Sequence, residues 1–181
     1  MASEQSGRSG PYALLLTGAP GVGKTTVIRR VAAQLEMRQL RGFYTEEIRD
    51  GGERRGFRLL GFHGQERLIA HTAFPKRHRV GKYGVDVAAI DDAAALLAPD
   101  PTARAYLVDE IGKMECLSER FVSAMRVLLA GRTPIVATVS LRGAGFIAEA
   151  KSLPQGLLWE VTHAIRDELP ARVKSWLTEK W

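Results

Sequence analysis

The segment at residues 18–25, GAPGVGKT, constrains this 181-residue chain more than any other feature of its sequence. It matches the pattern G-x-x-x-x-G-K-[ST] in full. It follows an apolar run at residues 12–17 and precedes residues 24–36, where Val27, Val31 and Leu35 recur at helical spacing. A glycine-rich turn between a buried strand and a helix lets backbone N–H groups converge on phosphate oxygens. The segment therefore predicts a phosphate-binding loop.

Each position of this loop has an expected role. The lysine of such a loop reaches the β and γ phosphates, so Lys24 is a candidate catalytic residue. The Thr25 hydroxyl is placed to bind Mg²⁺. The residues predicted to bind the phosphates are Gly18, Ala19, Pro20, Gly21, Val22, Gly23, Lys24, Thr25 and Thr26.

An acidic pair follows a second apolar run. Residues 105–108 predict a buried strand, and Asp109 and Glu110 come directly after it. If this strand lies beside the first one, its carboxyl end faces the phosphate loop. Asp109 is then a candidate Mg²⁺ ligand, directly or through a water. Glu110 is a candidate catalytic base that orients or deprotonates a water for attack on the γ phosphate, which favours hydrolysis over transfer to an organic acceptor.

Strand-like and helix-like segments alternate along most of the chain. Repeated βα units predict a three-layer α/β fold, with a mostly parallel central sheet and helices on both faces. Residues 42–71 differ, because β-prone segments alternate with turns, and they predict an inserted antiparallel β-meander. Residues 1–10 are expected to form a flexible tail and residues 11–181 a single domain. Further helices are predicted at residues 91–97, 121–129, 143–151 and 166–177, further strands at 134–138 and 157–161, and a loop at 72–84.

Composition limits the location and partners of the protein. No apolar run approaches the roughly 20 residues of a membrane-spanning helix, and no secretory signal precedes the first strand. Cys116 is the one cysteine, which excludes an internal disulfide and a multi-thiolate zinc site. We therefore expect a cytoplasmic protein, and a monomer because nothing in the sequence signals an oligomer. The net charge of +6 suits an anionic partner, either a phosphorylated ligand or a nucleic acid, and equally suits solubility alone.

Weaker candidates surround these motifs. The Thr138 hydroxyl, at the end of a predicted strand, is a candidate sensor of the γ phosphate, although a strand threonine is more often structural. Arg142 and the basic residues Lys76, Arg77, Arg79 and Lys82 are candidates for neutralising charge during phosphoryl transfer. The four histidines show no spacing typical of metal ligands.

Four further segments extend the pattern. They are GFYTEEIR at residues 42–49, RGF at 55–57, VGKYGVD at 80–86 and VDEIGKME at 108–115. With the phosphate loop, they make the chain resemble the thermophilic nucleoside triphosphatase family, also called the cancer-related nucleoside triphosphatase family, a group of P-loop NTPases. The similarity spans roughly residues 13–140, and residues 108–115 are its most specific segment.

The resemblance implies a RecA-like fold and slow, Mg²⁺-dependent hydrolysis of several nucleoside triphosphates, including ATP, GTP, CTP and UTP. By position it assigns Asp109 to the metal and Glu110 to the water, and it places the turn formed by Ile111, Gly112 and Lys113 at the nucleotide. Two departures are visible. Cys116 stands where the family commonly has leucine, and Ile165 with Arg166 where it often has Asn-Arg. If that pair contacts the base, base preference differs here.

Two other functions remain open from the sequence. A nucleotide or small-molecule kinase would share this size and loop, but it needs an acceptor pocket and an arginine-rich lid, for which residues 76–82 are the candidate. An RNA-associated switch would use the basic loop and the positive charge, although no RNA-binding motif supports it. The chain contains no asparagine, so it has no Asn-Lys-x-Asp guanine reader.

Overall fold

The structure, a computed structural model, describes residues 10–181, so all of the predicted tail except Gly10 lies outside it. The strands are β1 (Ala13–Thr17), β2 (Leu40–Asp50), β3 (Glu53–Gly61), β4 (Glu66–His71), β5 (Arg79–Val80), β6 (Tyr83–Val85), β7 (Ala105–Ile111), β8 (Ile135–Val139) and β9 (Gly156–Glu160). The α-helices are α1 (Lys24–Ala32), α2 (Val87–Ala93), α3 (Glu119–Ala130), α4 (Phe146–Lys151) and α5 (Leu169–Thr178). Short 3₁₀ turns span Met37–Gln39, Ala94–Leu97 and Glu115–Leu117.

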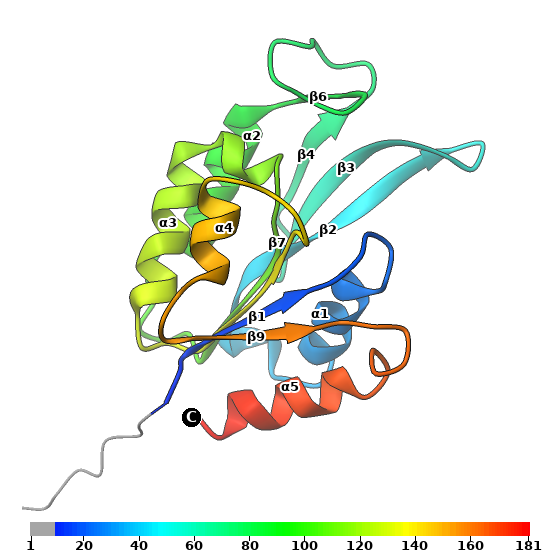
Figure 1. The fold of residues 1–181 in the computed structure, drawn as a ribbon. Coiled ribbons are helices and arrows are strands. Elements are labelled where there is room, and N and C mark those ends of the chain that lie inside the picture. The colour runs from blue at the N-terminus through cyan, green and yellow to red at the C-terminus, as the bar shows by residue number, and fades with distance from the viewer. Residues whose placement is uncertain (1–9) are drawn as a thin grey trace, which may run out of the picture.

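One mixed sheet organises the described residues, with strand order β5-β6-β4-β3-β2-β7-β8-β1-β9 (Figure 1). Strands β2, β7, β8, β1 and β9 pair in parallel and form the core of the sheet. Strands β3, β4, β6 and β5 extend it in antiparallel pairing from β2. The predicted α/β fold with an antiparallel insert is confirmed. The insert is longer than predicted, because residues 79–80 and 83–85 form a hairpin on β4 where the sequence indicated only a loop.

The position of the acidic strand differs from the prediction. β7 does not lie beside β1, because β8 lies between them and pairs with both: Val136 is opposite Leu14 on one side and Leu107 on the other. β7 also runs on to Ile111, so Asp109 and Glu110 belong to the strand and do not follow it. As a result, Thr138 on β8 stands between the phosphate loop and the acidic pair.

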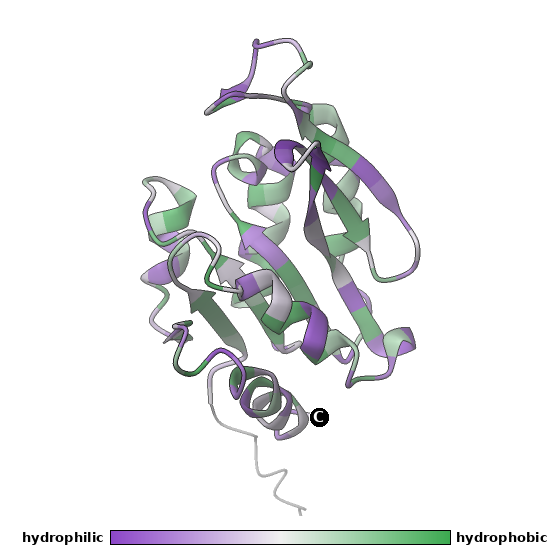
Figure 2. Cartoon of the chain, turned by 90° about the vertical axis from the view of Figure 1, so that its right-hand side faces the viewer, coloured by the Kyte–Doolittle hydropathy of each residue, from purple (hydrophilic) through white to green (hydrophobic). Residues whose placement is uncertain are grey.

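Strands β1, β7 and β8, in the middle of the parallel core, are buried on both faces. Ala13 and Leu15 of β1 belong to a hydrophobic cluster shared with α2, α3 and α4, whereas Leu14 and Leu16 face α1 and α5. This explains the unbroken apolar run that precedes the phosphate loop. The central strands are correspondingly green in Figure 2, the colour of hydrophobic residues. The three predicted layers are therefore present.

Helix boundaries differ from the predictions at several ends. α1 ends at Ala32, four residues earlier than expected. α2 begins at Val87, four residues earlier than expected, because the Asp86 side chain accepts a hydrogen bond from the Ala89 N–H at 3.0 Å and caps the helix. α4 and α5 both begin three residues later than expected. No helix within residues 10–181 has the length and apolarity that a bilayer-spanning segment requires.

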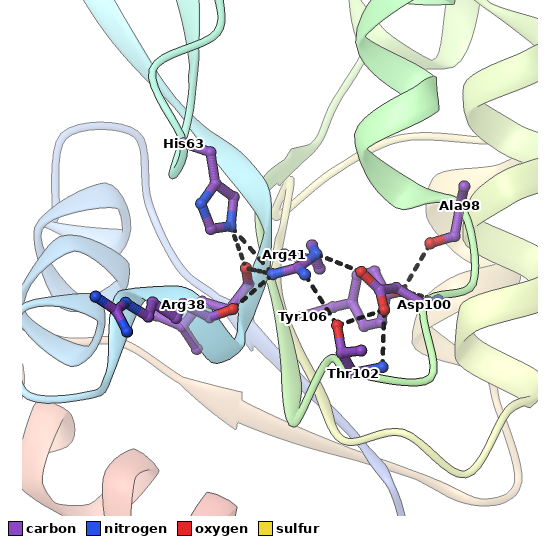
Figure 3. A network of polar contacts seen from close by, with 8 residues as sticks. Arg38, Arg41, His63, Ala98, Asp100, Thr102 and Tyr106 are labelled. Carbon is purple, nitrogen blue, oxygen red and sulfur yellow. Dashed lines mark hydrogen bonds and ion pairs between the residues drawn. The ribbon is translucent and has the colours of Figure 1, made fainter.

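A polar network ties the insert to the parallel core at the amino ends of β2 and β7, the end of the parallel strands opposite the phosphate loop (Figure 3). Arg41, at the start of β2, donates to Asp100 from Nε at 2.7 Å and to the Thr102 hydroxyl at 3.1 Å, and it contacts His63. It also donates to the backbone carbonyls of Arg38 and Leu40. Hydrogen bonds from the hydroxyl and backbone N–H of Thr102, together with Arg41, hold the pKa of Asp100 at about 2.

We expect Arg41→Ala to lower the melting temperature at pH 7 by roughly 2–6 °C, because one substitution removes several charge-assisted hydrogen bonds. Arg38→Ala is the matched control, because Arg38 joins the network only through its backbone carbonyl. Thermal denaturation followed by circular dichroism measures both. Equal melting temperatures in the two variants would contradict a stabilising role for this network.

Candidate active site

The phosphate loop is shaped by two glycines. Gly18 leaves β1 where a Cβ would lie 2.5 Å from the carbonyl oxygen of Val161, so no larger residue fits there. Gly23 has φ +113° and is the N-cap of α1. Val22, between them, is 4% exposed and packs against the hydrophobic core, which anchors the loop. The N-terminus of α1 therefore opens onto the loop, as phosphate binding requires.

Lys24 lies within the loop that it is predicted to serve. Its side chain is buried, and Nζ donates to the carbonyl oxygens of Gly18 at 3.1 Å and Ala19 at 3.4 Å. The same nitrogen lies 3.9 Å from Oε2 of Glu110. The structure thus brings together the two predicted catalytic residues, which are 86 positions apart in the chain.

Asp109 is buried among three threonines. It is 1% exposed, and its Oδ2 accepts hydrogen bonds from the hydroxyls of Thr25 at 2.7 Å and Thr45 at 3.1 Å. Its Oδ1 accepts from the Thr138 hydroxyl at 2.6 Å. Thr138 therefore positions the carboxylate, which is the structural alternative to its predicted role as a γ-phosphate sensor. Sequence reasoning missed Thr45, although it lies within residues 42–49, one of the segments that carry the resemblance.

The donor set around Asp109 fits Mg²⁺. Thr25 and Asp109 supply a hydroxyl and a carboxylate oxygen in direct contact, at the mouth of the phosphate loop. Mg²⁺ is usually held by one or two protein oxygens, with phosphate and water oxygens completing its shell. No group of three or more His, Cys, Asp or Glu in residues 10–181 is arranged to hold a metal by itself. This arrangement suits an ion that arrives with the phosphates.

We expect Thr138→Val, which keeps the shape of this buried side chain, to destabilise the protein by about 1–3 kcal/mol, because Oδ1 of Asp109 loses its hydrogen-bond donor. We also expect the Mg²⁺ concentration for half-maximal hydrolysis to rise. Urea denaturation and a Mg²⁺ titration of activity measure the two effects. Thr133→Val, just before the same strand, is the control, and an unchanged Mg²⁺ requirement in Thr138→Val would remove Thr138 from the site.

Glu110 faces the cavity in front of the loop. Its side chain is 31% exposed, and Oε1 accepts a hydrogen bond from the Ser140 hydroxyl at 2.6 Å. Ser140 comes just after β8, two residues beyond Thr138, so the end of one strand orients both members of the acidic pair. The sequence carries no signal for this role of Ser140, because it depends on β8 lying next to β7.

A second glutamate, Glu115, lies close to Glu110. Oε2 of Glu115 and Oε1 of Glu110 each lie within 3 Å of the point that a Cβ on Gly112 would occupy. Glu115 is only 5% exposed. Burial, and then the negative charges of Glu110 and Asp109, raise the pKa of its carboxyl to about 8. Glu115 is therefore protonated at neutral pH, and sequence reasoning gave it no role.

This elevated pKa predicts a pH-dependent stability. The folded protein holds the Glu115 proton more tightly than the unfolded chain, so wild-type stability falls as the pH rises from about 4.5 to about 8. Glu115→Gln is neutral throughout, and we expect it to become more stable than wild type by roughly 3–5 kcal/mol at pH 9. Urea denaturation at pH 5, 7 and 9 measures this, with exposed Glu36→Gln as the control. A difference that does not grow with pH would contradict the buried acid.

The remaining predicted residues fall into distinct places. Ile111 is fully buried in the core, so its side chain does not face a nucleotide. Lys113 and Arg142 line the cavity in front of the loop, whereas none of the four basic residues at 76–82 does. Burial raises the pKa of the Cys116 thiol to about 12, which fits the predicted packing role of that residue.

Two hollows meet at the phosphate loop. The larger has a volume of about 860 Å³ and extends from residues 18–26 to the antiparallel insert. The smaller, of about 210 Å³, shares Gly23 and Thr26 with it and is otherwise lined by Val27, Arg30, Arg166 and Asp167. Arg166 lies against the loop, with Nη1 donating to the Val22 carbonyl at 3.4 Å. Of the pair that departs from the family pattern, Arg166 therefore lines a hollow and Ile165 packs against the core.

Sequence comparison identifies the family. A family profile described as NTPase matches residues 13–174. The chain belongs to this NTPase family. Within the family it is 35% identical over 158 residues to nucleoside-triphosphatase THEP1 of Thermotoga petrophila, covering 86% of this chain and 87% of that protein. It is 37% identical over 161 residues to the cancer-related nucleoside-triphosphatase of Homo sapiens, covering 82% and 81%. The family predicted from the sequence is confirmed.

Structural comparison agrees. The crystal structure of THEP1 from Aquifex aeolicus superposes with a TM-score of 0.82 at 31% identity, covering 91% of this chain and 98% of that one. The antiparallel insert and the parallel core thus belong to the architecture of an NTPase family member. The individual roles of Lys24, Asp109 and Glu110 stay predictions.

Proposed function

We propose that this NTPase-family chain is a Mg²⁺-dependent nucleoside-triphosphate phosphohydrolase, with low turnover and broad base specificity. One observation carries the proposal: the Glu110 carboxylate, oriented by Ser140, faces the cavity 3.9 Å from the Lys24 ammonium. This geometry supports a base beside Lys24, the residue expected to bind the β and γ phosphates. The proposal includes a monomer in the cytoplasm, where the single cysteine suits a reducing environment.

The chemistry follows from this placement. The backbone N–H groups of residues 18–26 and the Lys24 ammonium bind the phosphates and hold the γ phosphorus near Glu110. A water oxygen attacks that phosphorus while the bond to the β–γ bridging oxygen breaks. Oε2 of Glu110 accepts the proton of the water, and the nucleoside diphosphate leaves with its bridging oxygen. Ser140 keeps the carboxylate aimed at the water through Oε1.

Mg²⁺ would be held by Thr25 and Asp109 and would supply positive charge to the phosphate oxygens. The hydroxyls of Thr25, Thr45 and Thr138 orient Asp109 for the ion before the ion binds. Three hydroxyls donate to one buried carboxylate, so Asp109 keeps a fixed orientation without a cation beside it. We infer that this reduces the reorganisation required on binding.

The smaller hollow is the candidate site for the nucleoside. It begins at Gly23 and Thr26 and is not lined by Glu110, and its polar side chains beyond the loop are Arg30, Arg166 and Asp167. Arg30 and Asp167 are already bonded to each other at 2.8 Å, and both are more than half exposed. An open groove with few unengaged polar groups offers little to distinguish one base from another, which supports broad specificity.

Release of phosphate from ATP, GTP, CTP and UTP tests the proposal, each with Mg²⁺ and with excess EDTA. We expect measurable release from all four with Mg²⁺, with rates within about tenfold of each other, and none with EDTA. Release from one nucleotide only would contradict the broad specificity. Release in EDTA would contradict the role of the ion.

A further inference from the structure

The larger cavity has an apolar end for which nucleotide hydrolysis has no use. Phe57 on β3, Val80 on β5, Met114 after β7 and Leu141 after β8 line it, and Leu141 is 43% exposed. Phosphates, Mg²⁺ and water gain nothing from contact with such side chains. Four segments distant in the chain nevertheless bring them into the cavity that Glu110 also lines.

The nucleoside does not account for this end. In the proposed function, Glu110 lies at the γ phosphate and the smaller hollow, which Glu110 does not line, takes the nucleoside. The cavity of about 860 Å³ therefore has to hold only the phosphates and their ion. A cavity of that volume is near the upper end of those that enclose a whole small ligand. Space for a second molecule remains between the γ phosphate and the insert.

The charged side chains around the cavity favour an anionic ligand. Arg54 is already engaged, because its Nη1 lies 2.6 Å from Oε1 of Glu47 and its Nε donates to the Tyr83 hydroxyl at 3.0 Å. Arg142 and Lys113 also line the cavity, and neither has an ion-pair or hydrogen-bond partner among residues 10–181. Their side chains are therefore available to an anion in this cavity, whereas Arg54 and Glu47 are engaged with each other.

The Phe57 ring at the cavity is preorganised by its neighbours. The Arg54 guanidinium lies over the Phe57 ring at 5.3 Å, and Phe57 meets the Tyr83 ring edge-on at 5.2 Å. The Phe57 ring is therefore held in a fixed orientation at the cavity surface. A rigid ring in a cavity that Lys113 and Arg142 also line fits a ligand with a planar apolar part and a negative group.

We propose that the insert end of the cavity is a binding site for a second small ligand, an organic anion with a planar ring, held by Phe57 and Leu141 on its ring and by Arg142 and Lys113 on its charge. The site lies next to the water that Glu110 is proposed to activate, so its occupancy changes turnover and leaves the affinity for the nucleotide unaltered. The proposal rests on the proposed function for the direction of the triphosphate and for the effect on turnover.

Naphthalene-1-sulfonate is the probe, titrated by calorimetry into protein saturated with Mg²⁺ and β,γ-imido-ATP. We expect it to bind with the nucleotide in place, and its Kd to rise about fivefold to tenfold in Leu141→Ala and in Phe57→Ala. Leu158→Ala, a similarly exposed leucine on β9, is the apolar control. Arg142→Ala is expected to weaken the probe to a similar extent, with the exposed, cavity-distant Arg132→Ala as its control.

Steady-state phosphate release in the same variants separates this site from the proposed function. We expect the probe to change kcat for ATP and leave KM unchanged, and Leu141→Ala to retain wild-type release without the probe. Absence of probe binding, displacement of β,γ-imido-ATP by the probe, or equal affinity in Leu141→Ala and Leu158→Ala would each overturn the second site. Loss of phosphate release in wild type would refute the hydrolase and leave the probe result to stand on its own.

Discussion

Lys24→Ala is expected to reduce phosphate release from ATP at least 100-fold, to below detection for a slow enzyme. The side chain is buried inside the phosphate loop, and among residues 10–181 its one ion-pair partner is Glu110 at 3.9 Å. Lys113 and Arg142 line the same cavity but do not belong to the loop, so we expect neither to replace Lys24. Removing one preorganised positive donor from a phosphoryl-transfer site costs several kcal/mol of transition-state stabilisation. We expect nucleotide affinity to fall as well, because Lys24 serves the ground state too.

A colorimetric assay of phosphate release measures the Lys24 prediction, with binding followed by a fluorescent nucleotide analogue. Lys174→Ala on α5 is the control for loss of one positive charge and should match wild type. Circular dichroism checks that both variants fold. Wild-type release by Lys24→Ala would place the activity outside this loop.

Glu110→Gln is expected to lower kcat by about 100-fold or more while nucleotide binding is kept. The amide oxygen of glutamine still accepts the hydrogen bond that Ser140 donates, so the geometry is preserved. The amide cannot take a proton from the attacking water. A change in kcat without a matching change in KM is the signature of a group that acts in the transition state.

Glu46→Gln controls for the loss of a carboxylate, because Glu46 lies on β2 in ion pairs with Arg29 and Arg58 and does not line the cavity. It should keep wild-type turnover. If Glu110→Gln also turns over at the wild-type rate, the water is activated by another group.

Local motifs predicted the centre of this site. The phosphate loop and the Asp109–Glu110 pair are each contiguous in sequence, and each follows an apolar run buried on both faces. Such signals need no knowledge of which strands are neighbours. The antiparallel insert was also predictable, because alternating residues and glycine turns are local signals.

The surrounding groups depend on strand order, which a single sequence does not reveal. Thr138, Ser140 and Thr45 act on the acidic pair only because β8 and β2 flank β7. Our interpretation considered the acidic strand as a neighbour of β1, named Thr138 only as a candidate phosphate sensor, and gave Ser140 and Thr45 no role. The hairpin of β5 and β6 was missed for a related reason. Strands of two and three residues are too short to show a hydrophobic alternation in the sequence, and they form because β6 pairs with β4 and β5 pairs with β6.

The most direct test of the account is hydrolysis of ATP in H₂¹⁸O, with the products analysed by mass spectrometry. Attack of a water on the γ phosphorus, as the position of Glu110 beside Lys24 requires, places one ¹⁸O in inorganic phosphate and none in ADP. We predict that distribution in wild type and its loss, with the phosphate itself, in Glu110→Gln. Label in ADP, or phosphate without label, would contradict the proposed attack.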